Sequence, residues 1–226
     1  MAGGGSSFSV AGAGSGRSDL FQAGAFVRNS IGSAYIAAAY GWQDTTTDRT
    51  VGSSALQARF NANTYSGRIE GGNRYALPRL GGVGVTPYAA VQVTALDLPG
   101  YTEAAAGGIN TFALTYAGKI VTATRSELGL RSDKSFAVNA AVLTLRGRAA
   151  WAHDYNIERS VAAAFQTLPG TAFVVNGAAP ARDSALTTAS AEMRFTSGIS
   201  LAATFEGEFS EFTRSYAGKG VMRYDW

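Results

Sequence analysis

The chain of 226 residues lacks cysteine altogether and has only one histidine and five prolines. Without cysteine it cannot form disulfides, bind zinc through thiolates or use a thiol as a nucleophile. Charged residues are also scarce, at 15%, against about 25% in ordinary soluble proteins. This low charge, with a mean hydropathy of +0.01, favours a chain whose alternate residues face an apolar and a polar environment.

A strong excess of positive charge is absent too. The chain has 19 basic and 16 acidic residues, which gives a net charge of +3. No run of Lys or Arg exceeds two residues, and the closest cluster is Arg146-Gly147-Arg148. The sequence therefore predicts a protein that does not bind nucleic acid, because such proteins carry a basic stripe or patch.

Two kinds of targeting segment are missing as well. The longest charge-free stretch, residues 160–181, is long enough for a transmembrane helix, but Pro169-Gly170 and Asn176-Gly177 would break it. We expect two strand segments around a turn there. Residues 1–7 have neither the basic nor the apolar region of a secretory signal. We therefore expect a fragment, or the mature portion, of an exported protein.

What the sequence does have is alternation, most clearly at its end. In residues 217–226, two glycines, Met222, Tyr224 and Trp226 share one face of a strand, and charged residues with Val221 take the other. The last strand of an outer-membrane barrel faces lipid on one side and places an aromatic at the membrane interface. This ending therefore favours such a barrel.

The same period of two continues through the chain, and helical periodicity never replaces it. The sequence predicts an all-β fold, a transmembrane antiparallel up-and-down β-barrel. Residues 1–18 are expected to be a flexible Gly/Ser-rich segment and residues 19–226 the barrel domain. About ten strands are expected, near residues 20–28, 34–43, 58–75, 84–97, 111–131, 137–156, 158–176, 184–196, 199–211 and 214–226.

The connections between these strands alternate in length. Short ones are expected at residues 29–33, 79–83, 131–136 and 197–198, and longer polar ones at residues 44–55, 98–110 and 178–183. Short periplasmic turns alternate with longer extracellular loops in outer-membrane barrels. The alternation of faces alone would also fit a soluble β-sandwich. Long strands, aromatics near strand ends, and small residues on the apolar faces favour the barrel over a packed core.

Several short runs resemble the β-domain of bacterial autotransporters, the translocator of type V secretion. Their order and spacing extend over residues 19–226, and the aromatic-ended last strand completes the resemblance. The runs are Phe21-Gln-Ala-Gly-Ala-Phe26, Ala34-Tyr-Ile-Ala-Ala-Ala-Tyr-Gly-Trp42, Thr47-Asp48-Arg49, Thr86-Pro87-Tyr88, Tyr101-Thr102-Glu103, Arg125-Ser-Glu-Leu-Gly-Leu130, Arg148-Ala-Ala-Trp-Ala-His153, Phe173-Val-Val-Asn-Gly177 and Arg182-Asp183.

This resemblance implies a twelve-stranded barrel with a helix threaded through its pore. The chain departs from that plan, because ten strands are visible and no helical segment precedes them. We therefore expect an N-terminally incomplete domain that translocates poorly by itself, with its passenger and pore helix absent. The resemblance implies three partners: outer-membrane lipid, the β-barrel assembly machinery, and the protein's own passenger and pore helix. It also implies that Tyr224 and Trp226 form the C-terminal assembly signal.

Charges on the faces opposite the apolar ones are the candidate functional residues. Both signs occur together, so a barrel lumen could pair them. They would serve either as structural salt bridges or as a hydrophilic conduit that meets the helix or the passing chain. The expected lumen-facing charges are Arg68, Glu70, Arg74, Arg125, Glu127, Arg131, Arg146, Arg148, Glu206, Glu208, Lys219 and Arg223.

Catalysis has little support in the sequence. His153 is the only histidine, and its neighbour Asp154 points to the opposite strand face, so we expect an interfacial residue. No catalytic residue, metal site or cofactor is predicted. The function indicated is an outer-membrane translocator and anchor that exports and displays an N-terminal passenger. It is expected to act as a monomer. A soluble lectin-like binding domain and an outer-membrane barrel enzyme stay open as alternatives.

Overall fold

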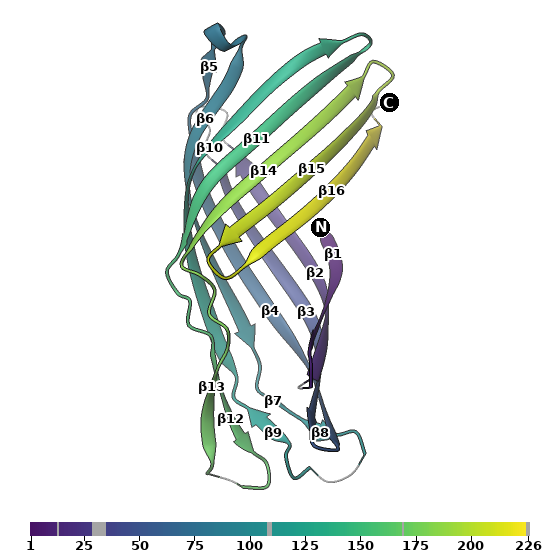
Figure 1. Cartoon of the computed structure of the whole chain (residues 1–226), viewed down its shortest axis with the longest axis vertical. Coiled ribbons are helices and arrows are strands. Elements are labelled where there is room, and N and C mark those ends of the chain that lie inside the picture. Colours follow the sequence, from purple (N-terminus) through teal and green to yellow (C-terminus); the bar gives the residue numbers. More distant parts are fainter. Residues whose placement is uncertain (13, 29–34, 108–109, 169, 225–226) are drawn as a thin grey trace.

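The structure is a computed structural model that describes residues 1–12, 14–28, 35–107, 110–168 and 170–224. Its main element is an antiparallel sheet in which each long strand pairs with the next long strand along the chain (Figure 1). The continuous path of this sheet comprises β1 (Ala2–Val10), β2 (Gly14–Arg28), β3 (Tyr35–Val51), β4 (Ser54–Gly72), β6 (Val83–Leu98), β10 (Lys119–Val138), β11 (Ala141–Asp154), β14 (Asp183–Phe195), β15 (Ile199–Ser210) and β16 (Arg214–Tyr224).

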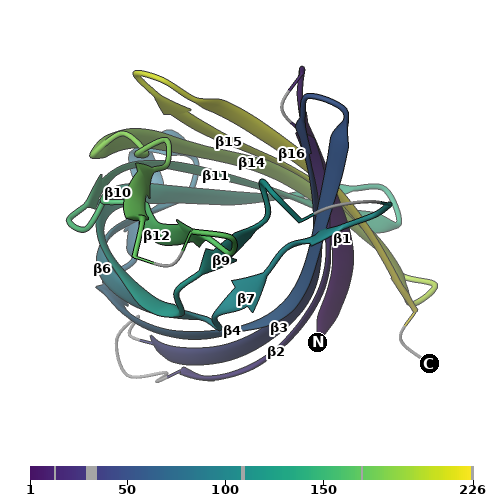
Figure 2. The same ribbon diagram turned by 90° about the horizontal axis from the view of Figure 1, so that it is seen from below.

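The sheet curls around a central space when it is viewed along its length (Figure 2). Short strands β5 (Tyr75–Leu77) and β8 (Ala104–Ala105) pair at its margins with β6 and β4. The edges of the sheet are β1 and β16, and within the described residues no backbone pairing joins them. The predicted all-β antiparallel barrel architecture is confirmed, with the ring left open between its first and last strands.

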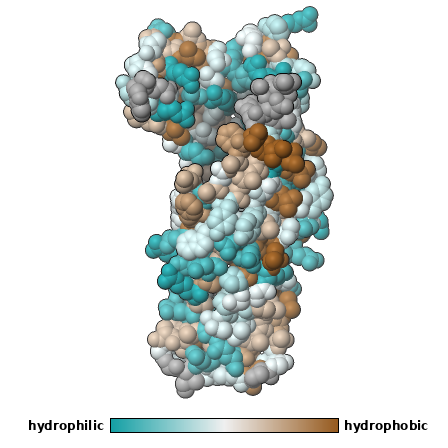
Figure 3. Space-filling view, turned by 180° about the vertical axis from the view of Figure 1, so that it is seen from behind, coloured by the Kyte–Doolittle hydropathy of each residue, from teal (hydrophilic) through white to brown (hydrophobic). Residues whose placement is uncertain are grey.

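Side chains alternate between the two faces of this sheet because successive residues of a strand point to opposite sides. On the outer face Tyr40 and Tyr65 lie 5.4 Å apart between ring centroids. On the inner face Ser66 and Thr94 hydroxyls are 3.1 Å apart. Many large apolar residues are exposed on the outer face, among them Ile69. Seen from behind, a hydrophobic area crosses the upper middle of the wall (Figure 3).

A second, four-stranded sheet lies at the lower end of the curled sheet, where it extends over part of the opening (Figures 1 and 2). We call it the mouth sheet, and its strands are β7 (Tyr101–Thr102), β9 (Leu114–Tyr116), β12 (Ser160–Phe165) and β13 (Ala172–Asn176). Phe60 of the wall stacks on Tyr101 at 4.2 Å, and Tyr101 stacks on Tyr116 at 4.5 Å. These rings fasten the mouth sheet to the wall.

The hydrophobic core is small and lies where the mouth sheet meets the wall. Leu56 and Ala62 are fully buried on β4, and Ala113 beside β9 and Ala163 on β12 are buried as well. Elsewhere the inner face is mainly polar, with a few buried apolar residues such as Ala90, Ala152 and Leu186. Apart from a 3₁₀ turn at Pro78–Leu80, the described residues are strands and loops. None of the described helical segments has the length and apolar character needed to cross a membrane.

Three expectations about the elements are wrong. Residues 2–10 and 14–18, expected to be flexible, form β1 and the start of β2, because a Gly/Ser-rich chain still offers backbone groups that a neighbouring strand can pair. Residues 158–176, expected as a wall strand, form the β12–β13 hairpin of the mouth sheet. The wall still has the expected ten strands, because β1 is added and residues 158–176 are not part of it.

The third error concerns two connections. The polar residues 44–55 are not a loop, since they continue β3 and β4 up to a tight turn at residues 52–53. Residues 131–136, expected as a turn, continue β10, and the chain turns at Asn139, whose φ of 50° is left-handed. Asparagine tolerates this conformation better than most residues. In both places polar residues face the inside of the sheet or lie at its rim, so polarity does not signal a loop.

Candidate functional site

The inner wall carries a compact group of charges that we call the central cluster: Arg68, Glu70, Glu127, Arg131 and Arg148. Arg68 of β4 donates to Glu70 at 2.9 Å and to both carboxylate oxygens of Glu127 at 2.9 and 2.8 Å. Strand β6 separates β4 from β10, so Arg68 connects strands that are not hydrogen-bonded neighbours. The cluster therefore ties three wall strands together through side chains.

Each carboxylate of the central cluster has a further arginine. Arg131 donates through both terminal nitrogens to Glu70, with an Nη2–Oε2 distance of 2.8 Å. Arg148 donates to Glu127 at 2.6 Å and to the hydroxyl of Tyr88 at 2.6 Å. The guanidinium of Arg131 lies 4.1 Å from the centre of the Tyr88 ring. Tyr88 thus separates and orients two arginines, as the face of an aromatic ring attracts a cation.

Burial makes this pairing necessary. The side chains of Glu70 and Glu127 are only 1% and 7% exposed, and a buried carboxylate without partners is strongly unfavourable. The cluster holds three arginines and two glutamates, so it retains one positive charge. Tyr35 adds a neutral donor, because its hydroxyl donates to Glu70 at 3.0 Å. The arrangement is a hydrogen-bonded polar network on the inner face of the curled sheet.

Other expected inward charges form separate pairs. Arg74 donates to Asp133 at 2.9 and 2.6 Å, and Arg146 donates to Glu192 at 2.7 Å. These pairs lie apart from the central cluster and involve more exposed side chains. Both pairs contribute less to the stability of the fold than the central cluster does, because water screens exposed ion pairs.

Arg125 and Glu208 form another pair nearer the mouth. The guanidinium of Arg125 contacts Glu208, lies 3.6 Å from Asp154 and donates to Ser184 at 2.7 Å. Glu206, Lys219 and Arg223 stand apart, since within the described part of the chain they form no ion pair. Glu206 lines a cavity of about 910 Å³ on the inner wall together with Arg131 and Arg148. The structure thus brings together some expected charges and leaves these three outside.

Several functional partners escaped the sequence analysis. Tyr35, Tyr88, Asp133 and Glu192 all hold the expected charges in place. The period of two could have placed Tyr88 on the inner face of β6, because Gln92 lies four residues further along the same strand. The pairing partners themselves depend on register between strands, which no local pattern contains.

The mouth holds a second ion pair that the sequence did not indicate. Arg49 of β3 donates from Nε to Glu103 at 2.8 Å, and the Leu114 amide and the Tyr116 hydroxyl donate to the same carboxylate at 3.0 and 3.1 Å. Burial acts to raise the pKa of Glu103, but the hydrogen bonds from Arg49 and the Leu114 amide outweigh it and hold the pKa below its usual range. Burial also raises the pKa of Tyr116 to about 12.

His153 lies on the outer face with its aromatic neighbours, as its strand parity predicts. Its ring is 5.7 Å from Trp151 and 4.8 Å from Tyr155, and its Nδ1 is 2.9 Å from Asp183. Across the described residues, no group of three or more His, Asp and Glu side chains could hold a metal ion. Of the expected assembly signal, Tyr224 ends β16 opposite Ile199, and Trp226 lies outside the described residues.

The sequence model of the autotransporter β-domain family matches residues 1–206. The chain therefore belongs to this family, and the predicted resemblance is confirmed. Its fold is similar to that of the β-domain of the Bordetella autotransporter BrkA, with a TM-score of 0.65 at 17% sequence identity, over 96% of this chain and 78% of that one. At this identity the likeness concerns the fold alone.

A curated relative is the extracellular serine protease of Serratia marcescens, which is 29% identical over 176 residues. The match covers 76% of this chain but only 16% of the protease. The chain thus spans about one sixth of the length of this relative, and the protease activity in that protein's name is not assigned to this chain. The family model that matches describes a β-domain.

Proposed function

We propose that the chain is the outer-membrane translocator and anchor that exports and displays a passenger joined to its N-terminal side. The observation that carries this proposal is the division of one curled sheet into two faces. Its outer face exposes apolar and aromatic side chains, and its inner face holds the central cluster. Lipid outside and a polar interior are what a barrel of this kind requires.

Four further points belong to the same proposal. The domain would reside in the bacterial outer membrane as a monomer, in contact with lipid, and the β-barrel assembly machinery would insert it. The passenger and its pore segment would meet the inner wall, where Arg131 and Arg148 line the cavity. Energy would come from passenger folding outside the cell. Membership in the autotransporter β-domain family supports each of these points.

The test joins a reporter passenger to the N-terminal side of the chain and expresses it in a bacterium with an outer membrane. We expect the reporter to become accessible to external protease, and the domain to migrate differently on a denaturing gel before and after boiling. A chain that stays monomeric and soluble in plain buffer, with no heat-dependent shift, would overturn the proposal and favour the soluble binding domain.

A matched pair of variants sharpens this test. Ala191 is exposed on the outer face of β14, and Ser190 beside it lines the inner cavity. Ala191→Arg places a charge against lipid, at a cost of about 2–4 kcal/mol near the middle of the membrane, so we expect less inserted protein. Ser190→Arg faces the polar interior and should insert normally. Equal effects of the two substitutions would contradict the assignment of faces.

A further inference from the structure

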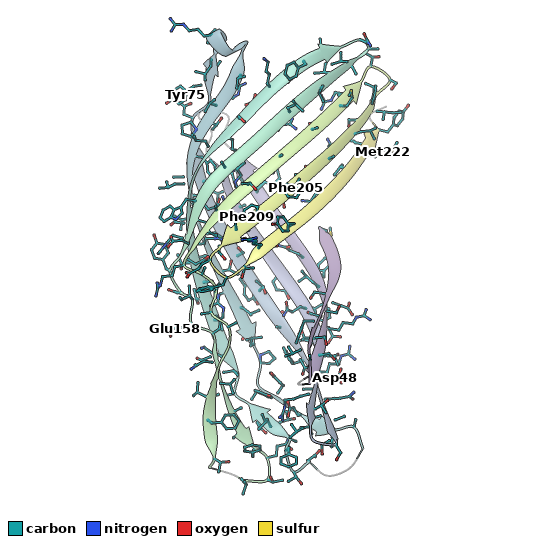
Figure 4. The ribbon with its side chains drawn as sticks, in the orientation of Figure 1. Asp48, Tyr75, Glu158, Phe205, Phe209 and Met222 are labelled. Carbon is teal, nitrogen blue, oxygen red and sulfur yellow. The ribbon has the colours of Figure 1, made fainter. Side chains whose placement is uncertain are left out.

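One part of the outer wall does not look like plain lipid-facing surface. Where β14 begins and β15 ends, a cavity of about 720 Å³ opens on the outside, lined by the aromatic side chains of Trp151, Phe209 and Phe212 with Ile157 and Pro180. These three aromatic residues are well exposed or only partly covered. We call this cavity the rim pocket. Figure 4 shows Phe209 near one end of β15, with Phe205 further along the strand.

The depth of the rim pocket in a membrane follows from the strand that carries Phe209. β15 has 12 residues, and about 3.4 Å per residue with a tilt of about 40° gives a height of roughly 30 Å. The apolar band of such barrels is about 25 Å tall. Phe209, next to the last residue of β15, therefore lies at the headgroup level rather than among acyl chains.

Two arginines flank the rim pocket. Arg182 lines it directly. Arg214 is the cross-strand partner of Phe209, and it shares the outer face with Tyr216, whose ring is 5.6 Å from that of Phe209. Both arginines are exposed, and neither forms an ion pair within the part of the chain that the structure describes. Arg182 also interacts electrostatically with its neighbour Asp183. Two exposed cations thus lie beside the apolar rings of this part of the wall.

Two acidic residues line the rim pocket, and they differ in how they affect the charge of the two arginines. Asp183 accepts a hydrogen bond from the Trp151 indole at 2.9 Å and lies 2.9 Å from His153 Nδ1, so it is engaged in fixing the Trp151 ring. Glu211 lines the pocket from the turn between β15 and β16. It is the one acidic lining residue that has no ion pair among the described residues, and it opposes an anionic ligand.

We propose that the rim pocket binds a phosphate-bearing lipid of the outer membrane, with an acyl chain against Trp151 and Phe209 and the phosphate near Arg182 and Arg214. This rests on the proposed outer-membrane location. Trp and Tyr at the headgroup level anchor a barrel in any bilayer, but two exposed arginines add a preference for negative headgroups. Such a lipid would fix the depth and rotation of the β14–β16 wall beside its open edge.

The test uses the folded full chain in detergent, mixed with equal amounts of phosphatidylglycerol and phosphatidylcholine, and counts the lipids retained by native mass spectrometry. We expect retention of one phosphatidylglycerol with a preference of about tenfold or more, as two arginines near an anionic headgroup would give. The combined Arg182→Gln and Arg214→Gln variant should lose this preference. Glu211→Gln should strengthen it, since it removes the opposing carboxylate.

The matched control is Arg17→Gln, because Arg17 is also an exposed arginine of the outer face but is paired with Asp19 at 3.2 Å. It should keep the preference. Equal retention of both lipids by the unchanged chain, or displacement of phosphatidylglycerol by inorganic phosphate alone, would overturn the lipid site. A gel shift on boiling, measured on each sample, reports the barrel separately. A folded barrel without lipid preference would thus refute the site and leave the proposed function standing.

Discussion

Arg68 and Glu127 lie on strands β4 and β10, and two hydrogen bonds of 2.9 and 2.8 Å join them across the intervening strand β6. The backbone hydrogen bonds of a sheet join each strand only to its immediate neighbours. This pair therefore adds a connection that backbone pairing cannot supply, and it does so on the inner face, where packed apolar side chains are few. The pair lies on the concave side of the curled sheet, where side chains of β4 and β10 reach one another over β6.

The first prediction concerns this pair. Arg68→Ala should destabilise the folded domain by about 3 kcal/mol, because it removes a partner from two buried carboxylates. The measurement is unfolding in urea, followed by the heat-dependent gel shift. Arg17→Ala, at an exposed pair of the outer face, should cost less than about 1 kcal/mol. Similar losses for both variants would contradict the role of burial.

The second prediction concerns pH and the mouth. The pKa of Glu103 is depressed in the folded state, so its contribution to stability is present above the unfolded pKa of about 4.3 and is lost as the pH falls through the lower folded value. Hydrogen exchange of residues 99–118, corrected for intrinsic rates, should therefore accelerate below about pH 4. Glu103→Gln should exchange fast at neutral pH and show no such acid step. An unchanged acid step in this variant would assign the effect to another group.

The third prediction tests a close approach of the wall to a ring. A Cβ at Gly129 would lie 2.7 Å from Tyr88 Cε1 and 2.6 Å from the Cβ of Ala150. Gly129→Ala should therefore displace Tyr88 and destabilise the domain by about 1–3 kcal/mol. Gly67 has no atom within 4 Å of such a Cβ, so Gly67→Ala should change the midpoint of urea unfolding little. Equal midpoints for the two alanine variants would rule out the steric explanation.

The fourth prediction concerns assembly. If the end of the last strand is read by the assembly machinery, Trp226→Ala should lower the amount of barrel in the outer membrane. The fraction that does insert should still shift on boiling, because Tyr224 and the rest of β16 keep their pairing with β15. Fractionation of cells with and without the substitution measures this. Unchanged insertion would show that the terminal aromatic is dispensable.

Alternation made much of the wall predictable. A period of two is a local property, so the sequence places Arg68 with Glu70 and Arg146 with Arg148 on common faces without any knowledge of neighbouring strands. The ion-pair partners of these residues could not be predicted from the sequence. Arg131 contacts Glu70 only because β10 pairs with β6 in one particular register. Sixty-one residues separate these two side chains. No local pattern encodes such a distance.

The mouth was the least predictable part for a related reason. The β12–β13 hairpin has the same alternation and small residues as a wall strand, and only its partner distinguishes it. Polar runs caused the opposite error, because they were predicted as turns but continue wall strands. Asp133 is one such residue, and it pairs with Arg74 inside the curled sheet. In a chain with a polar inner face, polarity marks the interior as often as it marks a loop.

The mouth sheet also has a consequence for timing. β9 follows β6 in the chain, and its partner β12 follows β11. Pairing of β9 with β12 closes a loop that contains β10 and β11, and this closure costs less chain entropy once β10 and β11 are already paired. The same holds for the hydrogen bond from Gln166 to the Glu103 carbonyl, at 2.7 Å. We therefore expect the mouth sheet to form late in folding, so that the interior stays accessible from that end until most of the wall has formed.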